Sequence, residues 1–319
     1  MAFFNPSSTS FSNLKHKTVV VSGGATGIGA ATVTLLAQQG ANVVIGDVNT
    51  RAAQTLIEHL DNPHHGKVLF QSCDVAKYAD VVSLFRFAFE KFAIVHHAIS
   101  CAGIFERGDW FDEALTRDSV GDDEGNLSVM DINVRGTMWF SRVAVVYLRD
   151  GRDENMVDDR SLTLMSSVNA FRESPKLFCY QTSKHAVHGF MRASRKPLWD
   201  RHRIRINCVC PGMTETPMTA GMVEKFQVGG LHWQTSEIVA NNILGILVRS
   251  ERTDDGSDEK GPDDWRPMVG KAIYIEGGDA WEFEDSLIAS QSAWLGEEAN
   301  RRMDENTEAV KRGALTSNN

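Results

Sequence analysis

The chain has 319 residues, of which 42% are hydrophobic and 24% charged, so it is long enough for one well-packed domain and its composition favours neither disorder nor a fibrous repeat. The net charge of -9 and the isoelectric point near 5.6 argue against a surface built to follow the phosphates of nucleic acid. No stretch approaches the roughly 18 apolar residues of a membrane span, and the five cysteines contain no Cys-x-x-Cys pair. We therefore expect a cytoplasmic protein with reduced thiols that binds neither nucleic acid nor membranes.

Residues 1–14 form a polar N-terminal tail without the apolar run of a signal peptide. Phe3 and Phe4 could contact a membrane or a partner, but a frayed tail is the interpretation that we prefer. From residue 15 to residue 280, short β-branched runs alternate with amphipathic segments of helix length, which is typical of βαβ units. The predicted strands, apolar as expected where helices cover both faces, are Thr18–Val21, Asn42–Gly46, Val68–Ser72, His96–Ser100, Leu162–Ser166, Arg205–Val209 and Ala272–Glu276. The clearest predicted helices are Gly29–Gln39, Arg51–His59, Ala79–Lys91, Val129–Leu148 and Thr182–Arg195.

The sequence therefore predicts a Rossmann-type, doubly wound α/β fold: a parallel seven-stranded sheet with helices on both faces, in a single catalytic domain over residues 15–280. Polar stretches at 106–126 and 150–159 and an acidic insertion at 250–264 are expected to be surface loops. The insertion could bind a basic partner, but its charge favours a solvated segment. Residues 281–319 form a C-terminal extension, the first half of which contains enough apolar residues to pack against the domain.

A glycine-rich turn follows the first predicted strand and opens the first predicted helix. There glycines permit a tight turn and close approach to a pyrophosphate, while free backbone N–H groups at the helix start can donate to it. The predicted cofactor contacts of this turn are Gly23, Thr26, Gly27, Ile28 and Gly29. The alternative is a turn that holds no ligand.

Asp47 ends the second predicted strand, near the expected spacing of about 20 residues for an acidic group that binds the adenosine ribose. Its charge would repel a ribose 2′-phosphate, Val48 follows it, and the glycine turn contains no lysine or arginine to hold such a phosphate. The sequence therefore favours NAD over NADP. NADP stays an alternative, because Arg51 lies one helical turn further on and could swing toward the 2′-phosphate.

Tyr180 and Lys184 are four residues apart at the start of a predicted helix, so both side chains project from one face. A phenol with a pKa of about 10 is a poor base at neutral pH. A neighbouring ammonium group and a cationic nicotinamide ring would lower that pKa and let Tyr180 exchange a proton with a substrate oxygen. The pair alone is also common by chance on exposed helices.

Several motifs in chain order resemble the short-chain dehydrogenase/reductase family over roughly Lys15–Gly278. They are Ser22-Gly23-x-x-x-Gly27-Ile28-Gly29, Ile132-Asn133-Val134, Ser166-Ser167, Tyr180-x-x-x-Lys184, Pro211-Gly212-x-x-x-Thr216 and Tyr274-Ile275-Glu276-Gly277-Gly278. The resemblance implies an NAD-preferring oxidoreductase of the Tyr-x-x-x-Lys type, with Tyr180 as the acid/base.

The same resemblance implies roles for single residues. Ser167 would orient the reacting oxygen, with Ser166 as the alternative; Lys184 would also hold the nicotinamide ribose, and Asn133 would anchor a water in a proton relay that requires a locally opened helix. Asp74 would lie beside the adenine and Thr216 would fix the nicotinamide carboxamide. The further cofactor contacts that it implies are Val75, Ser100, Ala102, Gly103, Pro211, Gly212 and Thr214, together with Tyr180 and Lys184.

Two features depart from the family pattern. The family's Asn-Asn-Ala-Gly appears as Ser100-Cys101-Ala102-Gly103, so the hydrogen bonds of two amides are lost or remade. Pro197 removes a backbone donor and should end the helix of Lys184 early. Metal motifs such as His-Glu-x-x-His do not occur, and we expect no metal.

A lid over residues 217–235 contains several apolar side chains, and Phe105, Trp110, Phe111, Phe171 and Phe178 lie near the catalytic motifs. We expect these residues to line a site for a bulky apolar secondary alcohol, such as a terpenoid, steroid-like or polyketide compound of secondary metabolism, which is oxidised to a ketone. The alternatives are an NADPH-dependent ketone reductase and a non-catalytic NAD-binding regulator. The resemblance also implies a homodimer or homotetramer formed through the predicted helices 129–148 and 182–195 and the last strand.

Overall fold

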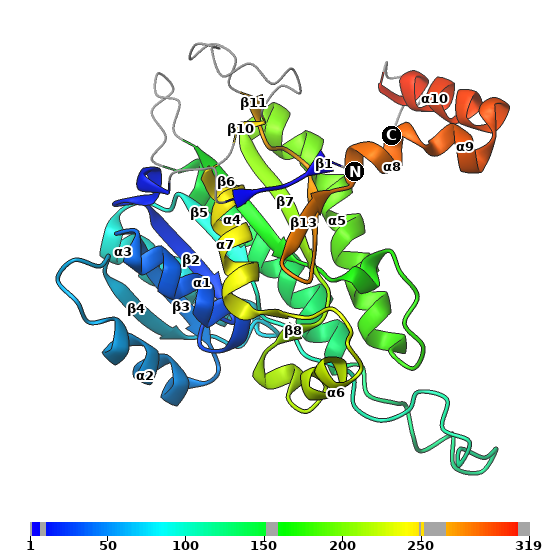
Figure 1. The fold of residues 1–319 in the computed structure, drawn as a ribbon, viewed down its shortest axis with the longest axis horizontal. Coiled ribbons are helices and arrows are strands. Elements are labelled where there is room, and N and C mark those ends of the chain that lie inside the picture. The colour runs from blue at the N-terminus through cyan, green and yellow to red at the C-terminus, as the bar shows by residue number, and fades with distance from the viewer. Residues whose placement is uncertain (1, 7–10, 151–158, 249, 252–265, 312–319) are drawn as a thin grey trace.

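A nine-stranded sheet forms the centre of the computed structural model, which describes residues 2–6, 11–150, 159–248, 250–251 and 266–311 (Figure 1). The strand order is β1-β13-β12-β7-β6-β5-β2-β3-β4. Their bounds are β1 Ala2–Phe3, β2 Thr18–Ser22, β3 Asn42–Asp47, β4 Val68–Ser72, β5 His97–Ser100, β6 Arg160–Met165, β7 Ile204–Pro211, β12 Ala272–Glu276 and β13 Asp279–Glu282. Every pair from β12 to β4 is parallel, which confirms the predicted seven-stranded parallel sheet.

Two antiparallel strands extend the sheet beyond the predicted seven. β13 pairs with β12, and β1 pairs with β13 through Ala2–Glu282 and Phe3–Trp281. Phe4 is buried, and its N–H donates to Ala280 O at 2.8 Å. The prediction of a frayed N-terminal tail was wrong for these residues, because β13 offers them an unpaired strand edge.

Separate hydrophobic cores lie on the two faces of the sheet, because successive strand residues point to opposite sides. Val19, Val21 and Ile45 face one core, whereas Val20 and Val44 face the other. The first core is covered by α1 (Gly27–Gln38), α2 (Thr50–Leu60) and α7 (Ser236–Val248). The second is covered by α3 (Tyr78–Phe92), α4 (Thr137–Arg149) and α5 (Phe178–His202). This arrangement matches the predicted doubly wound fold, although α7 was not among the predicted helices.

Two helices depart from their predicted form. The segment predicted as a helix from Val129 begins with a π-helix over Met130–Gly136 before α4 continues it. The predicted early end of α5 at Pro197 was wrong, because α5 continues to His202. Loss of one N–H donor near the end of a helix is tolerated here, and Arg203 ends α5 in a left-handed conformation with its N–H donating to Trp199 O at 2.9 Å.

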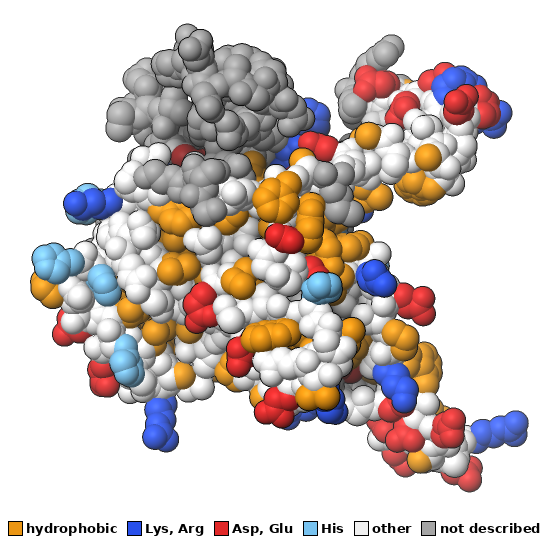
Figure 2. All heavy atoms as spheres, viewed as in Figure 1, with side chains coloured by type: hydrophobic (Ala, Val, Ile, Leu, Met, Phe, Trp, Pro, Cys, Tyr) orange, Lys and Arg blue, Asp and Glu red, His pale blue; other side chains and the backbone are white. Residues whose placement is uncertain are grey.

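The remaining described elements lie outside the sheet layers. The lid contains the helix α6 (Val223–Val228) and the short strand β9 (Gln234–Thr235), which pairs with β8 (Thr214–Glu215) just before the lid. Acidic side chains gather on the projecting segment 106–126 (Figure 2), which is exposed as predicted. Most of the predicted acidic insertion falls outside the described residues; β10 (Ser250–Glu251) and β11 (Arg266–Pro267) flank the part that is not described.

The C-terminal extension packs over a shorter length than its composition suggested. Phe283 and Glu284 are buried at the start of α8 (Glu284–Ala289), whereas Ile288 and Trp294, in α8 and α9 (Gln291–Leu295), are exposed. The helix α10 (Glu297–Lys311) stands away from the body of the molecule (Figure 1). None of the helices in the described part of the chain has both the length and the apolar character needed to cross a membrane.

Candidate active site

A cavity of about 700 Å³ lies at the carboxyl ends of the parallel strands. β2 and β5 are neighbours in the sheet, and the chain continues from them toward opposite edges. Ligands of open α/β sheets bind in the crevice outside such a switch point. Residues of the glycine-rich turn, of the Tyr180 motif and of the lid all line this one cavity.

The glycine-rich turn leaves no room for side chains at two positions. Gly23 has a left-handed φ of +66°, and a Cβ atom there would lie 2.6 Å from the backbone of Ala102. A Cβ atom on Gly29 would lie 2.0 Å from Gly23 O. The turn therefore brings bare backbone and the N-terminus of α1 to the cavity wall, which is the arrangement that binds a pyrophosphate.

Asp47 joins the turn to the end of β3. Its Oδ2 accepts a hydrogen bond from Ala25 N at 3.0 Å and its Oδ1 accepts one from Asn49 N at 2.9 Å. These bonds fix the carboxylate at the cavity wall while each oxygen keeps a lone pair for a further donor. Among the described residues that line the cavity, the only lysine and arginine side chains are Lys184 and Arg172; Arg51 does not line it.

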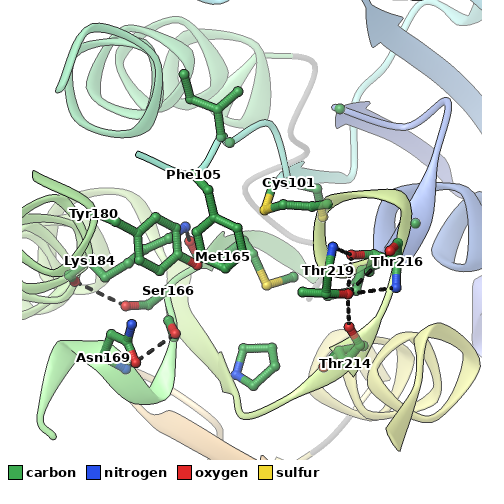
Figure 3. A pocket seen from close by; sticks show the side chains of 18 of the residues that line it. Cys101, Phe105, Met165, Ser166, Asn169, Tyr180, Lys184, Thr214, Thr216 and Thr219 are labelled. Carbon is green, nitrogen blue, oxygen red and sulfur yellow. Dashed lines mark hydrogen bonds between the residues drawn. The ribbon is translucent and has the colours of Figure 1, made fainter. Parts of the chain in front are cut away.

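Ser167, Tyr180 and Lys184 are brought together as predicted. All three are buried and line the cavity, Tyr180 and Lys184 from the first turns of α5 and Ser167 from the end of β6. Lys184 Nζ donates to Met165 O at 3.0 Å and lies 5.4 Å from the centroid of the Tyr180 ring. Ser166 instead donates its Oγ hydrogen to Lys184 O at 3.0 Å (Figure 3), so its hydroxyl is engaged by the backbone of α5.

Burial dominates the protonation of the two catalytic candidates. It raises the pKa of Tyr180 to about 12, although the hydrogen bond with Ser167 acts in the opposite direction. It also lowers the pKa of Lys184 to about 8. The sequence predicts a Tyr180 pKa that is lowered by Lys184 together with a bound nicotinamide ring. In the protein alone this pKa is raised, because desolvation of the phenolate outweighs the hydrogen bond with Ser167, and the joint effect of Lys184 and the cofactor stays a prediction.

Asn133 lies in the π-helix, the locally opened helix that its predicted role requires. Its Oδ1 accepts from Ile104 N at 2.9 Å, and its Nδ2 donates to Ile104 O and to Ser183 Oγ, both at 3.0 Å. A Cβ atom on Gly103 would lie 3.3 Å from Asn133 Oδ1 and 3.7 Å from Lys184 Nζ. Asn133 and Lys184 therefore approach each other behind Gly103, although Asn133 itself does not line the cavity.

The cavity contains nearly all of the predicted cofactor contacts. They are Gly23, Thr26, Gly27, Ile28, Gly29, Asp47, Val48, Asp74, Val75, Ala102, Gly103, Pro211, Gly212, Thr214 and Thr216. Ser100 is the exception, because it is buried under the cavity with its Oγ 3.4 Å from Thr137 Oγ1. Cys101, which replaces an amide of the family pattern, lines the cavity, and burial raises the pKa of its thiol to about 12.

The segment that follows Gly103 supports Tyr180 in a way that the sequence did not reveal. Phe105 packs edge-on against the Tyr180 ring, with centroids 4.4 Å apart (Figure 3). Glu106 Oε2 accepts hydrogen bonds from Cys179 N at 2.9 Å and Tyr180 N at 3.2 Å, so it caps the N-terminus of α5. A carboxylate so far from α5 in sequence gives no capping signal.

The predicted apolar lining was only partly right. Phe105 lines the cavity, and so do Met218, Met222 and Phe226 of the lid. Four predicted lining residues do not line it; they are Trp110, Phe111, Phe171 and Phe178. Trp110 packs against the cluster that contains Tyr180 and Phe171 packs against Tyr274, whereas Phe111 and Phe178 pack against each other. In the lid, Val228 and Leu231 are exposed.

Polar side chains that the sequence had not indicated line another part of the cavity. They are Arg172, His232, Tyr274 and Glu276. We call these four residues the polar wall. Tyr274 Oη donates to Glu276 Oε2 at 3.0 Å. Tyr274 and Glu276 were recognised only as part of a motif, and the only sequence signal for their position is the carboxyl end of the last parallel strand.

The fold and this cavity together define an α/β enzyme with a dinucleotide site next to a buried Ser-Tyr-Lys group. A family model described as short chain dehydrogenase matches residues 17–226. The chain therefore belongs to the short-chain dehydrogenase family, a family of oxidoreductases that use nicotinamide cofactors.

Individual relatives agree with this assignment. The chain is 32% identical over 208 residues to a 2,5-dichloro-2,5-cyclohexadiene-1,4-diol dehydrogenase of Sphingobium indicum, covering 65% of this chain and 76% of the relative. It is 26% identical over 305 residues to 5'-hydroxyaverantin dehydrogenase of Dothistroma septosporum, covering 93% and 95%. It is 30% identical to the short-chain dehydrogenase/reductase ascJ of Acremonium egyptiacum, of which the match spans 66%. Among solved structures, a short-chain dehydrogenase/reductase from Serratia marcescens superposes with a TM-score of 0.64 at 26% identity, covering 83% of this chain and 98% of that one.

Proposed function

We propose that the protein oxidises a secondary alcohol on a bulky, largely apolar skeleton to a ketone, with NAD as the cofactor. The observation that carries this proposal is the convergence of Ser167, Tyr180 and Lys184 in the same cavity as the glycine-rich turn and Asp47. The names of the Sphingobium and Dothistroma relatives, a cyclohexadiene-diol dehydrogenase and a hydroxyaverantin dehydrogenase, support a hydroxylated substrate, and the first name supports a ring skeleton.

The residues of the site fit the cofactor. The space left by Gly23 and Gly29 and the N-terminus of α1 suit the pyrophosphate, Asp47 suits the adenosine ribose hydroxyls, and Asp74 and Val75 lie on the adenine side by the family pattern. Pro211, Gly212, Thr214 and Thr216 would hold the nicotinamide end. When bound, NAD supplies the acceptor for a hydride from the substrate carbon.

The protein's own contribution is to orient the alcohol and to accept its proton. Ser167 Oγ and Tyr180 Oη would both hydrogen-bond the substrate oxygen, and Tyr180 in its tyrosinate form would take the alcohol proton as the ketone forms. Lys184, charged below its pKa of about 8, would favour the tyrosinate at that moment and hold the nicotinamide ribose. The proton would then leave past Lys184 toward Asn133, where the π-helix opens the backbone.

The preference for NAD follows from charge. The Asp47 carboxylate lies at the cavity wall, where it would repel a ribose 2′-phosphate. Among the described residues that line the adenosine side, none is a lysine or an arginine that could hold this phosphate. Oxidation is the favoured direction because cellular NAD pools are largely oxidised.

Assembly into a homodimer or homotetramer is part of the proposal. Met138 and Val146 of α4 are exposed, and a hollow between α4 and α5 is lined by apolar side chains that include Trp139, Phe190 and Leu198. Light scattering should give twice or four times the monomer mass, and Met138→Asp should reduce it to the monomer mass. A monomeric wild-type protein would contradict this part.

The test of the activity is reduction of NAD, followed by nicotinamide absorbance, with a panel of bicyclic and tricyclic secondary alcohols. We expect turnover with NAD, little with NADP, and a loss of about 10³-fold in kcat for Tyr180→Phe. Tyr78→Phe, which changes a half-exposed tyrosine on α3, should leave kcat unchanged. Turnover with NADP alone would make the protein an NADPH-dependent ketone reductase, and NAD binding without turnover would make it a non-catalytic NAD-binding protein.

A further inference from the structure

The polar wall has no part in the proton transfer, yet it belongs to the same cavity. Its members come from three separate segments: Arg172 from the loop before α5, His232 from the end of the lid, and Tyr274 with Glu276 from β12. Tyr274 and Glu276 are two residues apart on a strand and so project to the same face of the sheet. Their neighbours Ile273 and Ile275 face the opposite core.

Close packing against the backbone places the Glu276 carboxylate at the nicotinamide end of the cavity. A Cβ atom on Gly212 would lie 1.9 Å from Glu276 Oε2, so the carboxylate occupies space that only a glycine leaves open. Gly212 follows β7, which lies between β6, the strand that ends before Ser167, and β12. The Glu276 carboxylate therefore lies over the end of β7, one strand away from the strand that ends before Ser167.

The pair of Tyr274 and Glu276 is a hydrogen-bond acceptor with a fixed orientation. Burial, with the adjacent charge of Glu276, raises the pKa of Tyr274 to about 12, so its phenol stays protonated and donates to Oε2. Within the described residues, Tyr274 is the only hydrogen-bond partner of the Glu276 side chain. Oε1 therefore has unused acceptor capacity.

The charges around Glu276 indicate what kind of donor it would bind. Burial raises the pKa of Glu276, and the hydrogen bond from Tyr274 with the Coulombic effects of His232 and Arg172 offsets this only in part. The guanidinium group of Arg172 is a permanent cation of the same cavity and would repel a cationic substrate. A neutral hydroxyl or phenol can donate to Oε1 without bringing a further positive charge to Arg172.

We propose that Glu276, oriented by Tyr274, accepts a hydrogen bond from a second hydroxyl group of the substrate. This inference rests on the proposed function and narrows it: the preferred substrate is a rigid, mostly apolar alcohol of two or more rings, bearing a second hydroxyl or phenol that reaches Glu276 while the reacting oxygen is held by Ser167 and Tyr180. An alcohol without that group fits the apolar part of the cavity but leaves Glu276 Oε1 desolvated and without a donor.

The experiment compares kcat/KM for matched substrates that differ only in the second hydroxyl. Suitable pairs are α-tetralol against α-tetralols with a phenol at each free aromatic position, and 3-deoxyestradiol against estradiol. Hydrogen bonds to charged groups contribute about 1.5–3 kcal/mol. We therefore expect wild type to prefer the hydroxylated member of at least one pair by roughly 10- to 100-fold, mainly through KM.

Variants assign that preference to the polar wall. Glu276→Gln should reduce the preference at least fivefold while changing kcat/KM for the unhydroxylated member less than twofold, and Tyr274→Phe should reduce it by a smaller factor. Glu173→Gln, which changes an exposed carboxylate of the same cavity, should leave the preference as in wild type. An equal kcat/KM for both members of every pair, or equal losses for both members in Glu276→Gln, would overturn the proposal.

Binding separates failure of this inference from failure of the proposed function. The ketones of the same pairs can be titrated by tryptophan fluorescence into protein saturated with NAD. If no alcohol is oxidised but wild type binds the hydroxylated ketones at least fivefold more tightly than Glu276→Gln does, the oxidation is refuted and the hydroxyl site stands. Equal affinities of the two proteins refute the hydroxyl site, whether or not alcohols are oxidised.

Discussion

The adenosine half of the cavity and its substrate half are built by different means. The adenosine half consists of a backbone turn, the N-terminus of α1 and one carboxylate held by backbone N–H groups, all within a short stretch of chain. The substrate half consists of side chains from the loop before α5, the lid and β12, which only the folded sheet brings together. A backbone-built site leaves a pattern in the sequence, whereas a site assembled from distant side chains leaves almost none.

Gly29→Ala should break the adenosine half most severely. The new Cβ atom would lie 2.0 Å from Gly23 O, which is backbone and cannot move without opening the turn. We expect NAD binding to fall below detection in calorimetry and the free energy of unfolding to drop by about 2–4 kcal/mol in urea titrations.

Gly189→Ala provides the matched control. Gly189 lies within α5, and a Cβ atom there meets nothing within 4 Å. Alanine favours a helix over glycine by about 0.5–1 kcal/mol, so this variant should be slightly more stable and bind NAD normally. Similar losses in both variants would show that the turn is not the cause.

The same contrast explains how much of the fold could be predicted. The apolar runs and helix-length spacings gave the seven parallel strands because each βαβ unit carries its own local pattern. The two-residue strand β1 has no such pattern; it forms only because β13 leaves an unpaired edge. Pro197 was read as a local helix stop, but the last turns of α5 tolerate the loss of one backbone bond.

Lys184 lies where the adenosine half and the substrate half of the cavity meet. Lys184→Met should lower activity while raising stability. Because the pKa of Lys184 is lowered from 10.5 to about 8, the folded protein pays for a buried charge below pH 8, and this cost disappears as pH rises to 10.5. The variant should lose activity yet gain up to about 3 kcal/mol of stability at pH 7, less about 1 kcal/mol for the lost bond to Met165 O. Urea titrations should show the gain shrinking between pH 8 and 10.5; a variant less stable than wild type at pH 7 would refute it.

Glu106→Gln tests whether the cap of α5 positions Tyr180. We expect a loss of about 1–2 kcal/mol in stability and roughly tenfold in kcat, with KM for NAD unchanged, because the weakened cap loosens the first turn of α5. Asp112→Asn changes an equivalent carboxylate contact, to Ala114 N in the exposed segment, and should alter neither quantity. A normal kcat in a destabilised Glu106→Gln would show that Glu106 has only a structural role.

Two parts of the site could be predicted, because their spacing follows from one helix, one strand end and one turn. They are the glycine-rich turn and the group of Ser167, Tyr180 and Lys184. Ser100 was misplaced because its motif differs from the family pattern and its side chain is buried. The polar wall could not be found, because no local pattern relates Arg172 to Glu276. The raised pKa of Tyr180 depends on burial, which spacing does not reveal.

Removal of residues 297–319 should have the smallest effect. Residues 297–309 of α10 are exposed except for the half-buried Asn300, and the helix stands away from the body of the molecule (Figure 1). We expect the melting temperature to change by less than about 2 °C and kcat/KM to stay within twofold. A loss of activity would show that the extension reaches the site in solution.

The most direct test of the central claim is calorimetric titration of the protein with NAD and with NADP, because it needs no known substrate. The account predicts that NAD binds at least tenfold more tightly than NADP and that Asp47→Ala removes most of this difference, since one repulsive carboxylate causes it. Equal or tighter binding of NADP by wild type would contradict the assignment of Asp47 and with it the proposed direction of the reaction.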